Sequence, residues 1–272
     1  MSDELKTKYP IVLVHGAGFR DLKTPLYWGR IPKALEAGGA KVYYGLQDGI
    51  GGVRSNAEML AKRLPEILKE SGAGKVNIIA HSKGGVEARY VASSLGMGHM
   101  IASITTVATP HHGMKTVEKL FKIPRPVWSL TAFAARNWYR VFGDREPDLI
   151  RLADDLTPEK MRVFNEENPD VPGIFYQSFG TVMKRPTSDI NLMTANFAVK
   201  KIEGDNDGVV TVESSKWGEN FRLITANTNR GISHLDSIDF RRSRLSKKTG
   251  PGVSDIVDLY KEIVRDLKDR GL

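Results

Sequence analysis

The sequence predicts an α/β fold in which a mostly parallel central sheet lies between helices on both of its faces. Short, wholly apolar runs alternate with longer amphipathic segments, an alternation typical of strands buried between helices. The expected strands are Ile11–Val14, Lys41–Tyr44, Val76–Ala80, Ile104–Ala108, Ile174–Phe179 and Phe221–Thr225. A chain of 272 residues can bury a sufficient core as one domain of this class. We therefore predict a single domain over residues 1–272.

Amphipathic segments between and after these strands are expected to form the covering helices. They are Asn56–Glu70, Lys83–Leu95 and Ser254–Lys268. In the first, Leu60, Leu64 and Ile67 recur at three- and four-residue spacing, which places them on one face of a helix. Ser254 stands where its hydroxyl is expected to cap the last helix.

Residues 114–156 interrupt the alternation of strands and helices. The segment opens basic and proline-rich, around Pro124 and Pro126, and then turns aromatic. Apolar residues fall on one helical stripe within it: Val127, Leu130, Ala134, Trp138 and Val141. We predict an inserted helical cap that acts as a lid, and the alternative is an ordinary packed helix.

Composition excludes several classes of protein. The absence of cysteine removes disulfides, thiolate catalysis and sulfur-ligated metal sites. No apolar run approaches the ~20 residues of a transmembrane helix, and Met1–Lys8 lacks the apolar stretch of a secretory signal. We expect a soluble protein, either cytoplasmic or secreted without an N-terminal signal peptide. A net charge of +8 favours anionic partners, but no nucleic-acid-binding motif accompanies it, so we expect no nucleic acid partner.

The segment 76–85 reads VNIIAHSKGG, a buried strand that runs directly into a helix with Ser82 at the corner. Such a tight turn forces a serine into a strained conformation that exposes its hydroxyl, and small residues at Ala80 and Gly84 permit the close approach of strand and helix. The usual pattern is Gly-x-Ser-x-Gly, from which Ala80 departs by one methyl group. We predict Ser82 as a catalytic nucleophile, against the alternative of a serine found there by chance.

A serine hydroxyl needs a general base and a group that orients the base. Among the six histidines, His234 is favoured because the chain order in such folds is serine, acid, histidine. His81, beside the serine, is expected to point elsewhere. The acid is expected in the turn GDNDGVV at 204–210, where Asp207 is the first choice and Asp205 the alternative. A solvated turn would have the same composition.

Two backbone N–H groups are the expected oxyanion donors. One belongs to Lys83, the residue after the serine. The other belongs to Ala17, in the loop of small residues His15–Gly18 that follows the first strand.

The chain resembles the bacterial true lipases, family I of the bacterial lipolytic enzymes, which are α/β hydrolases. The resembling blocks are YPIVLVHG at 9–16, KVNIIAHS at 75–82, RYVA at 89–92, TPH at 109–111, NDGVV at 206–210 and HLD at 234–236. The resemblance implies Ser82, Asp207 and His234 as a triad, with Ala17 and Lys83 as oxyanion donors. It also implies hydrolysis of carboxyl esters, typically acylglycerols, under a mobile helical lid.

The resemblance further implies a structural calcium ion near the catalytic histidine, held between two aspartates. Asp236 stands at one carboxylate position, but Phe240 replaces a glutamine ligand, and Arg185 or Pro186 falls where the second aspartate is expected. Calcium binds six to eight oxygens, which this set does not supply. We predict no calcium and no cofactor, with Arg185 donating a forked pair of hydrogen bonds to Asp236. The alternative is that Asp189 restores a calcium site with Asp236.

The predicted activity is carboxylic ester hydrolysis through an acyl-enzyme, with an acylglycerol at a lipid–water interface as the expected substrate. His234 acts first as the general base and then as the acid. The alternatives are a carboxylesterase acting on small soluble esters, an acyltransferase, and a non-catalytic binding protein on a hydrolase scaffold.

Overall fold

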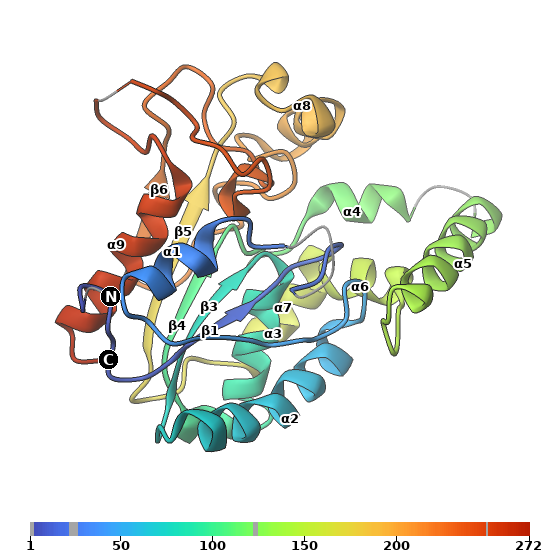
Figure 1. Cartoon of the computed structure of the whole chain (residues 1–272). Coiled ribbons are helices and arrows are strands. Elements are labelled where there is room, and N and C mark those ends of the chain that lie inside the picture. Colours follow the sequence, from blue (N-terminus) through green and yellow to red (C-terminus); the bar gives the residue numbers. More distant parts are fainter. Residues whose placement is uncertain (1–2, 22–26, 122–124, 249) are drawn as a thin grey trace.

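Six strands form a central sheet in the order β2-β1-β3-β4-β5-β6, and each pair of neighbours is parallel (Figure 1). The computed structural model describes residues 3–21, 27–121, 125–248 and 250–272, without the side chains of residues 120, 125–128, 130 and 131. The strands are β1 (Ile11–Val14), β2 (Val42–Tyr44), β3 (Val76–His81), β4 (Ile101–Val107), β5 (Phe175–Thr181) and β6 (Phe221–Ile224). All the strands expected from the sequence are confirmed, although β4 begins at Ile101 rather than Ile104.

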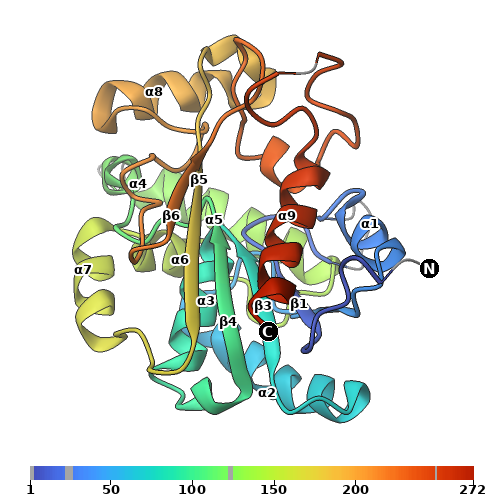
Figure 2. The ribbon, with the colours of Figure 1, turned by 90° about the vertical axis from the view of Figure 1, so that its left-hand side faces the viewer.

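Helices cover both faces of the sheet, as the sequence predicts. The α-helices of the described residues are α1 (Ile31–Ala37), α2 (Val53–Ser71), α3 (Lys83–Ala92), α4 (Lys115–Leu120), α5 (Arg125–Val141), α6 (Leu149–Asp155), α7 (Pro158–Glu167), α8 (Met193–Glu203) and α9 (Ile256–Asp269). Helices α1 and α9 pack on one face of the sheet and α2 and α3 on the other (Figure 1), and Figure 2 looks onto the face that α9 covers. Within the described chain, none of the helices has the length and apolar character needed to cross a bilayer.

Successive residues of a strand belong to two separate hydrophobic cores, one on each face of the sheet. Ile11, Leu13 and Ile79 pack with buried residues of α1 and α9. Val12 and Val14, which point to the opposite face of the same strand, pack with buried residues of α2 and α3. Because successive side chains of a strand point to opposite faces, a wholly apolar strand is what a sheet covered on both sides requires.

The N-terminal cap of α9 differs from the prediction. The Asp255 carboxylate, not the Ser254 hydroxyl, accepts the backbone N–H of Val257 at 3.2 Å. The same carboxylate binds the Arg30 guanidinium, with N···O distances of 2.8 and 3.0 Å. A carboxylate can cap the helix and bind a guanidinium together, so Asp255 links α9 to the segment that begins α1.

The segment 114–156 contains α4, α5 and α6, and α5 extends away from the sheet (Figure 1). On the stripe predicted from the sequence, Ala134, Trp138 and Val141 are exposed to solvent. The side chains of Val127 and Leu130 lie outside the described residues. The described part of the stripe is therefore not packed against the body of the protein.

The corner between β3 and α3 depends on glycines that lie against neighbouring backbone. A Cβ atom on Gly84 would lie 2.6 Å from the carbonyl oxygens of both Val14 and His15. These oxygens belong to β1 and the loop after it, and backbone atoms cannot move aside as a flexible side chain can. Only glycine therefore allows α3 to start this close to β1.

We expect Gly84→Ala to lower the free energy of unfolding by roughly 1–3 kcal/mol, the usual cost of overpacking a tight site. Urea denaturation of the purified variant measures the change. Gly74→Ala is the matched control, because a Cβ there would meet no heavy atom within 4 Å. Equal stability of the two variants would show that α3 can shift away from β1 at little cost.

Candidate active site

Ser82 lies at the corner between β3 and α3 in a left-handed backbone conformation, with φ 53° and ψ −132°. This region is costly for a residue with a side chain and persists only where the surroundings enforce it. The residue is 7% exposed, so the serine that was expected to present its hydroxyl openly is largely covered here. Its Oγ makes no hydrogen bond to another described residue.

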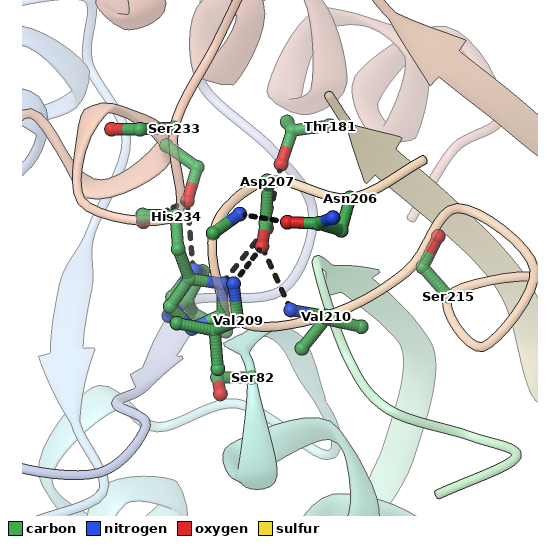
Figure 3. A network of polar contacts seen from close by, with 12 residues as sticks. Ser82, Thr181, Asn206, Asp207, Val209, Val210, Ser215, Ser233 and His234 are labelled. Carbon is green, nitrogen blue, oxygen red and sulfur yellow. Dashed lines mark hydrogen bonds and ion pairs between the residues drawn. The ribbon is translucent and has the colours of Figure 1, made fainter. Parts of the chain in front are cut away.

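Asp207 and His234 come together next to this corner (Figure 3). His234 Nδ1 lies 2.8 Å from Asp207 Oδ2, which also accepts the Thr181 hydroxyl at 3.0 Å. Asp207 Oδ1 accepts the backbone N–H groups of Val209 and Val210 at 3.0 and 2.8 Å. Because the other groups around this carboxylate all donate to it, the carboxylate also accepts a hydrogen bond from His234 Nδ1, which carries the proton. Nε2 of the imidazole then remains free to act as a base.

Asp205, the alternative acid, lies elsewhere. Its side chain is 69% exposed and pairs with Lys200 at 3.4 Å. Of the two carboxylates in this turn, the structure brings only Asp207 to the imidazole. Gly208, with φ 105°, makes the turn between Asp207 and the N–H groups that bind it.

His81 links Tyr27 to the backbone of His234 through a chain of hydrogen bonds. The Ser237 hydroxyl donates to the His234 carbonyl at 2.7 Å, so His81 Nε2–H must donate to Ser237 Oγ, also at 2.7 Å. His81 Nδ1 is then an acceptor for the Tyr27 hydroxyl at 2.6 Å. The rings of His81 and His234 lie 4.4 Å apart. Burial, and then the charge of His234, holds the pKa of His81 well below 6.5, so His81 stays neutral beside the candidate base.

The loop after β1 approaches Ser82 closely. A Cβ on Gly16 would lie 2.7 Å from Ser82 Cβ. The Tyr27 hydroxyl also lies against Gly16, 2.5 Å from where a Cβ would stand, and the N–H of Ala17 makes no hydrogen bond to another described residue. Lys83 is the first residue of α3, and the first N–H groups of a helix lack partners within the helix. The two predicted oxyanion donors thus belong to the loop after β1 and to the first residue of α3.

The role predicted for Lys83 involves its backbone N–H, but its side chain is also fully buried. Its Nζ lies 2.5 Å from Glu87 Oε1 and donates to the Asp48 carbonyl at 3.2 Å. Asn56 and Gln47 donate to the two carboxylate oxygens of Glu87 at 2.8 and 3.2 Å. A buried ion pair needs such additional donors to offset its desolvation. The i,i+4 spacing of Lys83 and Glu87 was the available signal.

The expected partner of Asp236 was wrong. Arg185 is exposed, and the Asp236 carboxylate instead binds Arg230 and Arg241, at 2.9 and 3.2 Å. Arg241 also lies 3.2 Å from Asp189, so this one arginine contacts both aspartates. Arg185 precedes a turn that directs it to solvent, while Arg230 lies in the same loop as Asp236. The described residues contain no group of three or more acidic or histidine side chains suited to a metal ion.

A parallel sheet between helices, a serine at a left-handed strand–helix corner and an adjacent aspartate–histidine pair define an α/β hydrolase. No family model matches the chain. A triacylglycerol lipase of Vibrio cholerae is 39% identical to it, over 98% of this chain and 90% of the relative. A triacylglycerol lipase of Pseudomonas fragi is 27% identical over the whole of both chains.

The crystal structure of the Staphylococcus hyicus lipase shares the fold, with a TM-score of 0.68, 18% identity and 97% of each chain covered. The chain belongs to the triacylglycerol lipase family, and it is a serine ester hydrolase.

Two buried histidines make the stability of the fold depend on pH. Burial, followed by neighbouring positive charge, holds the pKa of His81 and of His111 well below 6.5. The unfolded chain takes up protons at these positions as pH falls below 6.5, and the folded chain does not. These two groups therefore make stability rise with pH up to about 6.5.

We expect the Tm to be lower at pH 5 than at pH 7 and His111→Gln to reduce this difference. The exposed His99 provides the control, because His99→Gln should leave the difference unchanged. Scanning calorimetry at a series of pH values measures the effect. A His111→Gln profile parallel to that of the wild type would argue that His111 is protonated in the folded state.

Proposed function

We propose that the protein hydrolyses acylglycerols through an acyl-enzyme on Ser82. The observation that carries this proposal is the hydrogen bond between Asp207 and His234, at 2.8 Å, next to the corner that holds Ser82. In the first step His234 Nε2 takes the hydroxyl proton while Ser82 Oγ attacks the ester carbonyl. The imidazolium then gives this proton to the leaving alcohol, and water releases the acid by the same route.

Asp207 supports both half-reactions without being protonated itself. It is 1% exposed, and four groups donate to its oxygens, so its orientation is set before substrate binds. It fixes the tautomer of His234 and stabilises the imidazolium that forms. The negative charge on the substrate oxygen is assigned to the N–H groups of Ala17 and Lys83, where donors held by a rigid backbone need no rearrangement.

We propose that this chemistry requires no cofactor and no metal ion. Proton transfer is assigned to His234 and charge stabilisation to backbone N–H groups, which leaves no step for a bound ion to perform.

Ser82→Ala should reduce ester turnover by at least a hundredfold while leaving the fold intact, because the acyl-enzyme cannot form. Asp207→Asn should cause a somewhat smaller loss. Asp205→Asn is the control and should keep wild-type activity, since its side chain points to solvent. Initial rates on p-nitrophenyl esters, with circular dichroism as the folding check, test all three. A severe Asp205→Asn and a mild Asp207→Asn would reverse the assignment of the acid.

We further propose that residues 114–156 form a lid within the single domain of residues 1–272. Ser82 is 7% exposed, so a bulky ester needs some part of the structure to move. An open groove of about 510 Å³ lies between α5 and α6, lined by Phe133 and Ile150 among others.

The proposed lid is anchored shortly after the end of α5. Asp144 accepts Arg20 Nη1 at 2.8 Å and the Ile50 N–H at 3.0 Å. Arg20 follows the loop that holds Ala17, so the anchor joins the proposed lid to the proposed oxyanion loop.

The exposed side chains of α5 favour a lipid surface over a small soluble ester. Phe133, Trp138 and Val141 are 62, 63 and 82% exposed. A cluster of large apolar side chains in solvent marks a surface that interacts with an apolar partner. An aggregated lipid offers such a partner, and a dissolved ester does not.

The double variant Phe133→Ser/Trp138→Ser should lower the rate on emulsified triacylglycerol severalfold while leaving the rate on a dissolved p-nitrophenyl ester nearly unchanged. The reason is that these side chains would lose apolar contact with the lipid. Leu223→Ser, which removes an exposed apolar side chain from β6, is the control and should affect neither rate. A wild type with no gain in rate above the solubility limit of its substrate would indicate a lidless esterase.

A further inference from the structure

Two buried carboxylates lie together beside the loop that carries His234. Asp189 precedes the short 3-10 turn Ile190–Leu192, and Asp236 begins the turn Asp236–Ile238. Each residue is 2% exposed. Two carboxylates in such a place need about two positive charges nearby, because an unpaired buried charge is strongly destabilising.

Two guanidinium groups supply this charge. Arg241 bridges the pair, with Nη2 3.2 Å from Asp189 Oδ2 and Nε 3.2 Å from Asp236 Oδ1. Arg230 binds Asp236 from a second direction, with Nη2 2.9 Å from Oδ2 and 3.2 Å from Oδ1. The four groups together are neutral, as two carboxylates with one divalent cation would be.

The calcium ion implied by the family does not fit these residues. Hydrogen-bond donors already occupy the two carboxylates: the Ser233 hydroxyl donates to Asp189 at 2.7 Å, and the Ser233 N–H to Asp236 at 3.1 Å. Phe240 stacks on Phe19, with ring centroids 5.1 Å apart, and offers no ligand. A divalent cation would also face two guanidinium groups already in place.

We propose that Arg230 and Arg241 form a guanidinium clamp that takes the place of a structural divalent cation and positions the His234 loop. Both arginines also donate to the Ser188 carbonyl, at 2.8 and 2.9 Å, and Ser188 Oγ donates back to the Arg230 carbonyl at 2.5 Å. The clamp thus joins residues 188–189 to residues 230–241. Ser233, which binds both aspartates, directly precedes His234 in this loop.

Only the positioning role depends on the proposed catalytic function of His234. The replacement of a cation by arginine is a statement about structure and stability, and it is measured without activity.

The first experiment follows the Tm of the wild type by scanning fluorimetry with EDTA, with calcium and with magnesium. We expect none of these three additions to change the Tm. A Tm that falls with EDTA and recovers with calcium but not with magnesium would overturn the proposal and assign a metal site to Asp189 and Asp236.

The second experiment removes the clamp. Arg230→Ala/Arg241→Ala leaves the two carboxylates without a cation, so we expect a lower Tm that calcium raises and magnesium, which demands a stricter octahedral geometry, raises less. The control is Arg185→Ala, which removes an exposed arginine near the same turn and should change neither the Tm nor the calcium response. A double variant as stable as this control would overturn the proposal.

If the double variant does not fold, Arg241→Gln removes only the bridging guanidinium. It should lower the Tm, respond to calcium and, well below its Tm, show a reduced kcat with an unchanged KM. Arg241→Lys should recover part of the kcat. Loss of kcat without any calcium response would count against the replacement of a cation. If Ser82→Ala stayed active while calcium still rescued Arg241→Gln, the proposed triad would fail and the clamp would stand.

Discussion

The close contact of α3 with β1 is the constraint on which the rest of the site depends. Gly84 lies against the carbonyls of Val14 and His15, and Ser82 takes up the resulting corner with a φ of 53°. This contact brings the N-terminus of a helix, the loop after β1 and a serine side chain within reach of one another. A more gradual turn between β3 and α3 would move these three groups apart, and a change of side chain could not restore their distances.

Around this corner, buried charged groups are held by hydrogen bonds that join segments distant in the sequence. Lys83 and Glu87 connect α3 to the loop after β2, where Asp48 lies, and the Asp207–His234 pair connects two loops at the end of the sheet. Buried ion pairs contribute little net stability, but their hydrogen bonds have few alternative arrangements. Their effect here is geometric, because each holds a segment that borders Ser82.

The polar interior contrasts with the apolar surface of α5. In the interior, Asp207 and Glu87 each accept several hydrogen bonds, which restrict the orientation of their carboxylates. The exposed side chains of α5 gain nothing from water, and their free energy falls only when an apolar partner covers them. The buried polar contacts and the exposed large apolar side chains thus lie in different parts of the chain.

The sequence alone determined the strands, the covering helices and the corner at Ser82, because each depends on neighbours within a few residues: apolar runs, helical spacing and small residues beside a serine. It also ranked Asp207 and His234 from their order in the chain. Only the tertiary structure decided the partners of the buried charges. Ser188 and Arg241 are 53 positions apart, and Asp255 rather than Ser254 caps α9 while it binds Arg30. Arg185 was the wrong choice for Asp236, because pairing between distant residues depends on which segments meet in space, and the local pattern carries no record of that.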